Sequence, residues 1–130
     1  MYKVTIDDVA ELTQEVSRVC FATAVSADSR ERTSDCVTTL TIEGVVAFDS
    51  EKTFMKDSVK KLAEWSLVDP TNANPNRTVS VEFNHAGAIR KYKLTHAFVV
   101  SFEERFEDQN GFFKLVLQQS NDKPEGICIE

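Results

Sequence analysis

Residues Lys91–Gln119 read KYKLTHAFVVSFEERFEDQNGFFKLVLQQ and decide the fold, because they predict a long β-hairpin. On the first arm, six side chains recur at a spacing of two or a multiple of two: Leu94, His96, Phe98, Val100, Phe102 and Phe106. This spacing places side chains on one face of an extended strand. After the turn segment Glu107–Gly111, residues 112–117 form a second run rich in aromatic and aliphatic strand formers. The protein is therefore expected to be built around a β-sheet.

Shorter segments on both sides of the hairpin also read as strands. They lie within Glu15–Val25, Cys36–Phe48, Arg77–Phe83 and Ile127–Ile129. Gly44 interrupts the second of them, which indicates a bulge or a close approach of another backbone. Asn84–Gly87 is predicted to be a turn. Segment Asp7–Gln14 allows two interpretations, a short helix capped by Asp8 or a loop.

One amphipathic helix is predicted between Thr53 and Ser66. Its apolar stripe has spacings of three and four and consists of Met55, Val59, Leu62 and Ser66, with Trp65 beside it. The fold class is therefore mainly β: a small β-barrel or two-sheet sandwich with one amphipathic α-helix packed beside it. The 130 residues fit a single domain, 1–130. The expected core anchors are Leu62, Trp65, Phe98, Val100 and Phe102.

The charge of the chain argues against a nucleic-acid partner. The net charge is −6, and the basic residues form no cluster that would release phosphate counterions. No run approaches the ~20 apolar residues of a membrane span, so membrane insertion is not expected. The first residues have no apolar segment of signal-peptide length. We expect a cytoplasmic protein that leaves the cell only through a dedicated machine.

The search for catalytic and metal-binding patterns yields no candidate. Cys20, Cys36 and Cys128 cannot all pair within one chain and form no CxxC motif, so free structural thiols are expected, with Cys20 and Cys128 buried. His85 and His96 have no second histidine at ligand spacing, which disfavours a metal site. No glycine-rich phosphate loop or nucleophile elbow is present. We expect no catalytic residue, no cofactor and no enzymatic activity.

The polar segment Ser26–Asp35 joins two predicted strands and carries more charge than a hairpin turn requires. Its charged residues are Asp28, Arg30, Glu31, Arg32 and Asp35. A solvated loop, a phosphate clamp and a contact between subunits are the alternatives for this segment. These five residues are the candidates for an assembly loop.

Short motifs along the chain resemble one known family. They are Asp28-Ser29-Arg30, Ser34-Asp35, Leu40–Gly44 (LTIEG), Lys61–Ser66 (KLAEWS), Arg77–Glu82 (RTVSVE), Arg90-Lys91-Tyr92, Ala97–Glu104 (AFVVSFEE) and Gly111–Leu115 (GFFKL). In this order they resemble the tail-tube-like proteins of contractile injection systems, which include Hcp-like type VI secretion tubes and phage tail tubes. The resemblance runs from about Asp28 to the C-terminus.

The resemblance implies a structural subunit that assembles with itself into hexameric rings, which stack as the inner tube of a contractile device. It further implies sheath, baseplate or effector proteins as partners, and a lumen able to hold an effector. Two other functions remain open from the residues. A small barrel could bind an apolar ligand among Phe21, Phe48, Phe83, Phe98 and Phe102, or an adaptor domain could bind a partner by strand addition.

Overall fold

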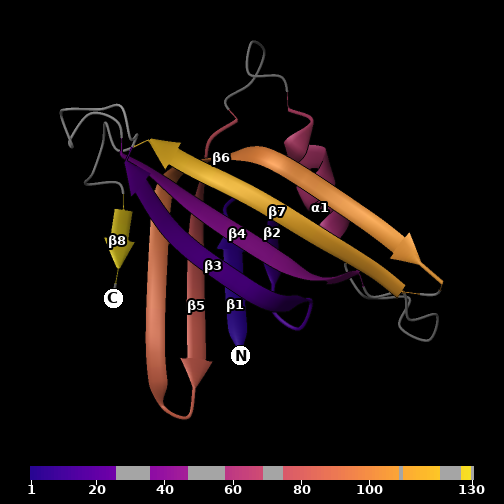
Figure 1. Cartoon of the computed structure of the whole chain (residues 1–130), viewed down its shortest axis with the longest axis horizontal. Coiled ribbons are helices and arrows are strands. Elements are labelled where there is room, and N and C mark those ends of the chain that lie inside the picture. Colours follow the sequence, from indigo (N-terminus) through magenta and orange to yellow (C-terminus); the bar gives the residue numbers. More distant parts are fainter. Residues whose placement is uncertain (26–35, 47–57, 69–74, 109, 121–126, 130) are drawn as a thin grey trace.

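The computed structural model describes residues 1–25, 36–46, 58–68, 75–108, 110–120 and 127–129. Its elements are β1 (Tyr2–Ile6), β2 (Ala10–Leu12), β3 (Val16–Val25), β4 (Cys36–Val46), α1 (Ser58–Ser66), β5 (Arg77–His85), β6 (Ala88–Glu107), β7 (Asn110–Ser120) and β8 (Ile127–Ile129). The strands form one open antiparallel sheet in the order β2-β1-β5-β6-β7-β4-β3, and β8 also pairs with β6 (Figure 1). The predicted fold class, mainly β with one short helix, is confirmed.

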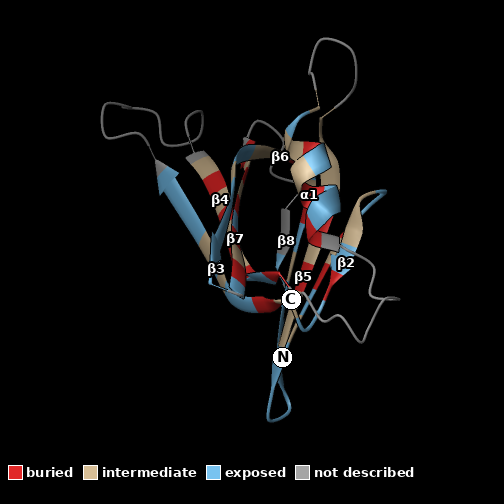
Figure 2. Cartoon of the chain, turned by 90° about the vertical axis from the view of Figure 1, so that its right-hand side faces the viewer, coloured by how far each residue is buried: buried red, intermediate tan, exposed pale blue. Residues whose placement is uncertain are grey.

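The sheet folds into two layers because β6 belongs to both. The first part of this 20-residue strand pairs with β5 on one edge and with β8 on the other. Its second part pairs with β7, from Phe98↔Gln118 to Glu107↔Asn110. We call β1, β2, β5, β8 and the first part of β6 the first layer, and β3, β4, β7 and the second part of β6 the second layer. Figure 2 shows the two layers on opposite sides, with β6 passing between them.

The long hairpin of β6 and β7 confirms the prediction from residues 91–119, but its predicted face is wrong. The register shifts between Val99 and Ser101 opposite β7, and β6 shows a second irregularity opposite the start of β5. Each extra residue in a strand turns the following side chains to the other face. Leu94 and Ala97 are consequently both buried, at an odd spacing.

Three expected core anchors of β6 are affected by these shifts. Phe102 is half-buried and packs against the core. Phe98 is half-buried on the outer face, opposite Gln118, and Val100 is 49% exposed at the bulge. The expectation that Phe98 and Val100 anchor the core was wrong, because the alternation assumed a strand without bulges.

The hydrophobic core lies between the two layers, and α1 covers one end of it. Leu62 is 0% exposed and Trp65 is 4% exposed, together with Val59 from the same helix. The indole Nε1 of Trp65 donates a hydrogen bond to the carbonyl oxygen of Pro75 at 2.8 Å, which ties the helix to the segment leading into β5. The predicted helix end at Ser66 is confirmed, and its predicted start at Thr53 lies outside the described residues.

Gly44 in β4 combines a bulge with a close backbone approach. Opposite it, the register of β3 shifts between Val16 and Arg18. A Cβ atom on residue 44 would overlap the carbonyl oxygen of Glu15 and lie 2.8 Å from Cε1 of Phe113. That same carbonyl oxygen accepts a hydrogen bond from the backbone N–H of Val45 at 2.8 Å. The close approach predicted at this glycine is confirmed.

The N-terminal segment differs from both interpretations of Asp7–Gln14. It contains the strand β2, which pairs with β1 after a turn in which Asp8 has a φ of 61°. The β5–β6 connection confirms the turn predicted at Asn84–Gly87. Ala86 and Gly87 have φ values of 51° and 85°, and two positive values at a two-residue connection are typical of the type I′ hairpin turn.

Candidate assembly surface

The second layer has two strand edges that no strand in the described part of the chain covers. β3 pairs with β4 along one edge only, and it ends the strand order. On the other side of the layer, pairing between β5 and β6 stops at Arg77↔Ala97, so β6 continues from Phe98 with β7 on one edge alone. Uncovered edges present backbone donors and acceptors that can pair with another chain.

Apolar side chains accompany one of these edges. In the second part of β6, Val100 is 49% exposed and Phe106 is 56% exposed. Solvent-exposed aromatic and branched side chains next to an uncovered strand edge favour association with another surface. The bulge that removes Val100 from the core therefore places it on the candidate surface.

The outer face of the second layer carries a row of alternating charges across four strands. Arg18 lies opposite Glu43, Glu43 opposite Lys114, and Lys114 opposite Glu103. A guanidinium nitrogen of Arg18 is 3.6 Å from a carboxylate oxygen of Glu43. Cross-strand pairs of opposite charge each contribute roughly 0.2–1 kcal/mol, so the row helps to fix the register of the layer. Sequence reasoning missed this row, since it depends on the register.

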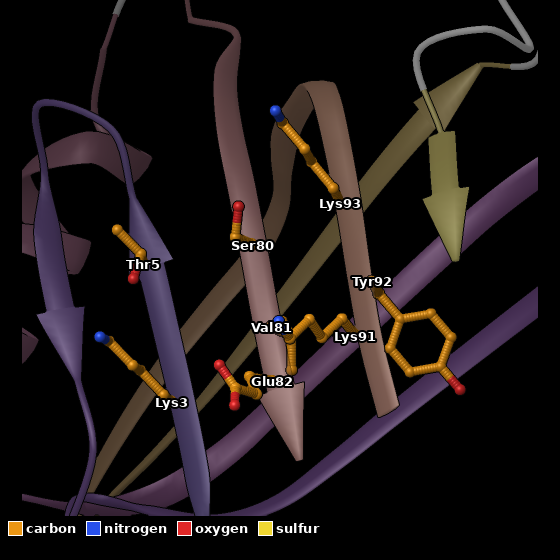
Figure 3. Close-up of a pocket in the computed structure, with 8 residues that line it drawn as sticks. All are labelled: Lys3, Thr5, Ser80, Val81, Glu82, Lys91, Tyr92 and Lys93. Atoms are coloured by element: carbon orange, nitrogen blue, oxygen red, sulfur yellow. The ribbon is translucent and has the colours of Figure 1, made fainter. Parts of the chain in front are cut away.

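The outer face of the first layer holds an open groove of about 270 Å³. Lys3 and Thr5 from β1, Ser80 and Glu82 from β5, and Lys91 and Lys93 from β6 line it (Figure 3). These residues alternate along their strands with the buried Val4, Ile6, Val79, Val81 and Leu94, so they point away from the core. The signal in the sequence was the spacing of two between Lys91 and Lys93.

The residues predicted for an assembly loop, Asp28, Arg30, Glu31, Arg32 and Asp35, lie outside the described residues. Among the cysteines, Cys20 is a free thiol. It is exposed on the outer face of β3, so the expectation of a buried thiol was wrong at this position. The side chains of Cys36 and Cys128 are not among those described.

The two histidines lie apart from each other. Nδ1 of His96 is 2.8 Å from the hydroxyl oxygen of Thr95. The backbone N–H of His96 donates a hydrogen bond to Oε1 of the buried Gln119 at 2.8 Å. His85 stacks on Phe83 near the tip of the β5–β6 hairpin, with ring centroids 6.4 Å apart. Over the residues that the structure describes, no group of three or more metal-ligating side chains comes together. The same residues include no helix long and apolar enough to cross a membrane.

Comparison with solved structures gives matches over nearly the whole chain. One is described as a type six secretion system protein, with a TM-score of 0.56, 13% identity, and 92% of this chain and 78% of that chain covered. A chain of an extracellular contractile injection system sheath-tube complex in the extended state has a TM-score of 0.58, 14% identity, and 99% and 87% coverage. A chain of the anti-feeding prophage tube-terminating cap has a TM-score of 0.56 with the same identity and coverage.

No family model matches the chain, and no curated protein matches it by sequence. At 13–14% identity the solved structures share the fold, and they include the class of proteins that the sequence motifs resemble. The resemblance predicted from the sequence is therefore confirmed at the level of fold. This chain has the tube-like β fold found in structures of type six secretion and contractile injection systems.

Proposed function

We propose that this protein is a structural subunit of a contractile injection device, and that copies of it form hexameric rings that stack as the inner tube. The observation that carries the proposal is the second layer, which is four strands wide and in which no described strand pairs with the outer edge of β3 or of the second part of β6. The edge of β3 and the edge of β6 are different surfaces, so pairing one with the other joins copies head to tail. Such a contact forms a ring when the rotation between neighbouring copies closes.

The lateral contact in this proposal pairs the free edge of β3 in one copy with the free edge of β6 in the next. Main-chain hydrogen bonds would then continue the sheet from subunit to subunit. Val100 lies in this second part of β6, so its exposed side chain would be covered by a neighbour. The fold shared with chains of a sheath-tube complex and of a tube-terminating cap supports the same assembly.

Partners and location follow from this role. We propose that the ring contacts sheath, baseplate or effector proteins, that its lumen holds an effector, and that the protein is made in the cytoplasm and exported by the device itself. An enzymatic activity forms no part of the proposal.

Native mass spectrometry and negative-stain electron microscopy test the ring directly. The expected species has six times the subunit mass of 14.6 kDa and appears as closed rings. A strictly monomeric protein at all concentrations would contradict the proposal. A monomer that captures a single different protein would favour the adaptor function, and one that copurifies with an apolar small molecule would favour the ligand-binding function.

A substitution at the β3 edge tests how the ring closes. Thr23 faces the inner side of this edge strand, opposite the buried Thr38, yet it is exposed in the isolated subunit. An inward-pointing charge on an edge strand blocks pairing with another chain. Thr23→Lys should therefore keep the melting temperature and lose the rings. Gln14→Lys, in the exposed turn before β3, adds the same charge and should assemble normally. Rings of Thr23→Lys would show that another surface closes them.

A further inference from the structure

The two ends of β6 carry opposite charge. Its first residues include Arg90, Lys91 and Lys93 and no acid, whereas residues 103–108 at the other end hold four carboxylates and one arginine. All of these side chains are exposed. One strand thus ends in a basic surface on the first layer and an acidic hairpin tip on the second.

The basic end belongs to the groove on the outer face of the first layer. Lys3 lies opposite Glu82, and Glu82 lies opposite Lys91. Lys3 also forms an ion pair with Glu11 at 3.7 Å. Within the described part of the chain, neither Lys91 nor Lys93 has a carboxylate at ion-pair distance. Three ammonium groups thus line a groove that contains one carboxylate, on a protein whose net charge is −6 (Figure 3).

The acidic end is the tip of the β6–β7 hairpin. It carries Glu104, Glu107 and Asp108, and an Arg105 whose Nε is 3.0 Å from a carboxylate oxygen of Glu107. The exposed ring of Phe106 lies among these charges. A narrow tip that combines surplus negative charge with one aromatic ring complements a groove with surplus positive charge, which Val81 and Tyr92 also line.

The groove and the tip of one copy cannot meet. Residues 91 and 107 belong to the same strand, and at about 3.3 Å per residue their separation along the strand is roughly 50 Å. A β6–β7 tip that enters the groove is therefore that of another copy. Because the groove and the tip are different surfaces, one copy can offer its tip to one neighbour and its groove to another, and the contact can then repeat from copy to copy.

We infer that the acidic β6–β7 hairpin tip of one copy docks in the basic groove lined by Lys3, Lys91 and Lys93 of a second copy. This inference rests on the proposed self-assembly, and it names a contact distinct from the pairing of strand edges. The contact is electrostatic at its rim, so it governs the rate and the salt dependence of association.

Two charge-reversed variants test the docking. In Lys91→Glu/Lys93→Glu both the groove and the tip are acidic, and in Glu104→Lys/Glu107→Lys both are basic. Each variant alone should need about tenfold more protein for half-maximal assembly than the parent, because attraction becomes repulsion. An equimolar mixture should assemble like the parent, since every groove then finds a tip of opposite charge. Light scattering against protein concentration measures this.

Salt and a matched variant complete the experiment. Raising the salt from about 0.05 M to about 0.5 M should weaken assembly of the parent and narrow its difference from each variant, because exposed charges are screened. Lys60→Glu/Lys61→Glu makes the same change of net charge on exposed helix positions outside the groove, and it should assemble like the parent. Unchanged melting curves exclude misfolding as the cause of any loss.

The outcomes separate this inference from the proposed function. If the groove variant assembles at the same concentration as the parent, the docking is wrong and the ring proposal stands. If each variant fails alone and the mixture fails as well, the charges do not face each other and the docking is again wrong. A parent protein that never assembles overturns both. The contact is supported if each variant by itself assembles poorly and the equimolar mixture assembles like the parent.

Discussion

Gly44→Ala should be among the most destabilising single-methyl changes in this chain. The added Cβ would overlap the carbonyl oxygen of Glu15 and approach Cε1 of Phe113 to 2.8 Å. That oxygen belongs to backbone and already accepts the N–H of Val45 at 2.8 Å, so it cannot retreat without lengthening this hydrogen bond. The Phe113 ring is 3% exposed and is held in the core.

The magnitude follows from these two effects. Overpacking a well-filled site costs typically about 1–3 kcal/mol. Weakening one backbone hydrogen bond costs about 0.5–1.5 kcal/mol, and the lower entropy of the unfolded alanine chain returns about 0.4–1 kcal/mol. The central values of these ranges combine to a net loss in the free energy of unfolding of about 2 kcal/mol. With a urea m-value of about 2 kcal/mol/M, the midpoint should fall by about 1 M.

Urea denaturation of the unassembled subunit, followed by circular dichroism, measures this shift. Gly87→Ala is the matched control, because it adds the same methyl group where no atom lies within 4 Å. Gly87 has a φ of 85°, so the control should lose about 1 kcal/mol through backbone strain alone. If the urea midpoint of Gly44→Ala lies within about 0.3 M of the parent's midpoint, the shift expected at this m-value is missing. The close backbone contact would then not be what fixes this bulge.

Four further changes have expected outcomes. Leu62→Ala should lower the free energy of unfolding by about 2–5 kcal/mol because the side chain is fully buried, and an unchanged denaturant midpoint would contradict this. Trp65→Phe leaves a backbone carbonyl without its 2.8 Å donor and should cost about 1–3 kcal/mol, measured by thermal melting. Replacing Arg30 and Arg32 together by Glu should leave the circular dichroism spectrum and the melting temperature unchanged. It should abolish the stacking of rings in electron micrographs, because small ionic contributions repeat around a ring. Normal stacking would mean that the segment is a solvated loop. Cys20→Ser, and reductant added to the parent, should leave the melting temperature unchanged, and a large loss would reveal a structural disulfide.

Periodic segments of the sequence predicted most of the fold. The hairpin of β6 and β7, the strands β3, β4 and β5 and the end of α1 all follow from spacing and turn residues. β1 and β2 were missed because five-residue and three-residue strands give too little alternation to be recognised. The bulge near Val100 was missed for a different reason. A bulge depends on the register with the partner strand, and an uninterrupted apolar run carries no local signal of it.

The candidate surface was less accessible to sequence reasoning. The predicted assembly residues were chosen for their density of charge, between Asp28 and Asp35, and they lie outside the described residues. The groove combines Lys3 with Lys91 and Lys93, which are far apart in the chain and meet only through the pairing of β1 with β5 and of β5 with β6. The sequence shows that residues 88–107 are basic at one end and acidic at the other. That these two ends lie far apart on different layers follows only from the structure, in which the residues form one long strand.

The continuity of β6 has a mechanical consequence. The strand is 20 residues long and its backbone is already extended, so it has little slack when it is pulled from its ends. A tensile load applied along β6 is carried by the covalent bonds of its backbone. Sliding one layer against the other requires shearing many hydrogen bonds to β5 or to β7 at once, since bonds along an extended strand share the load. The subunit should therefore behave as a stiff link along the direction of β6 and should yield first in the connections outside it.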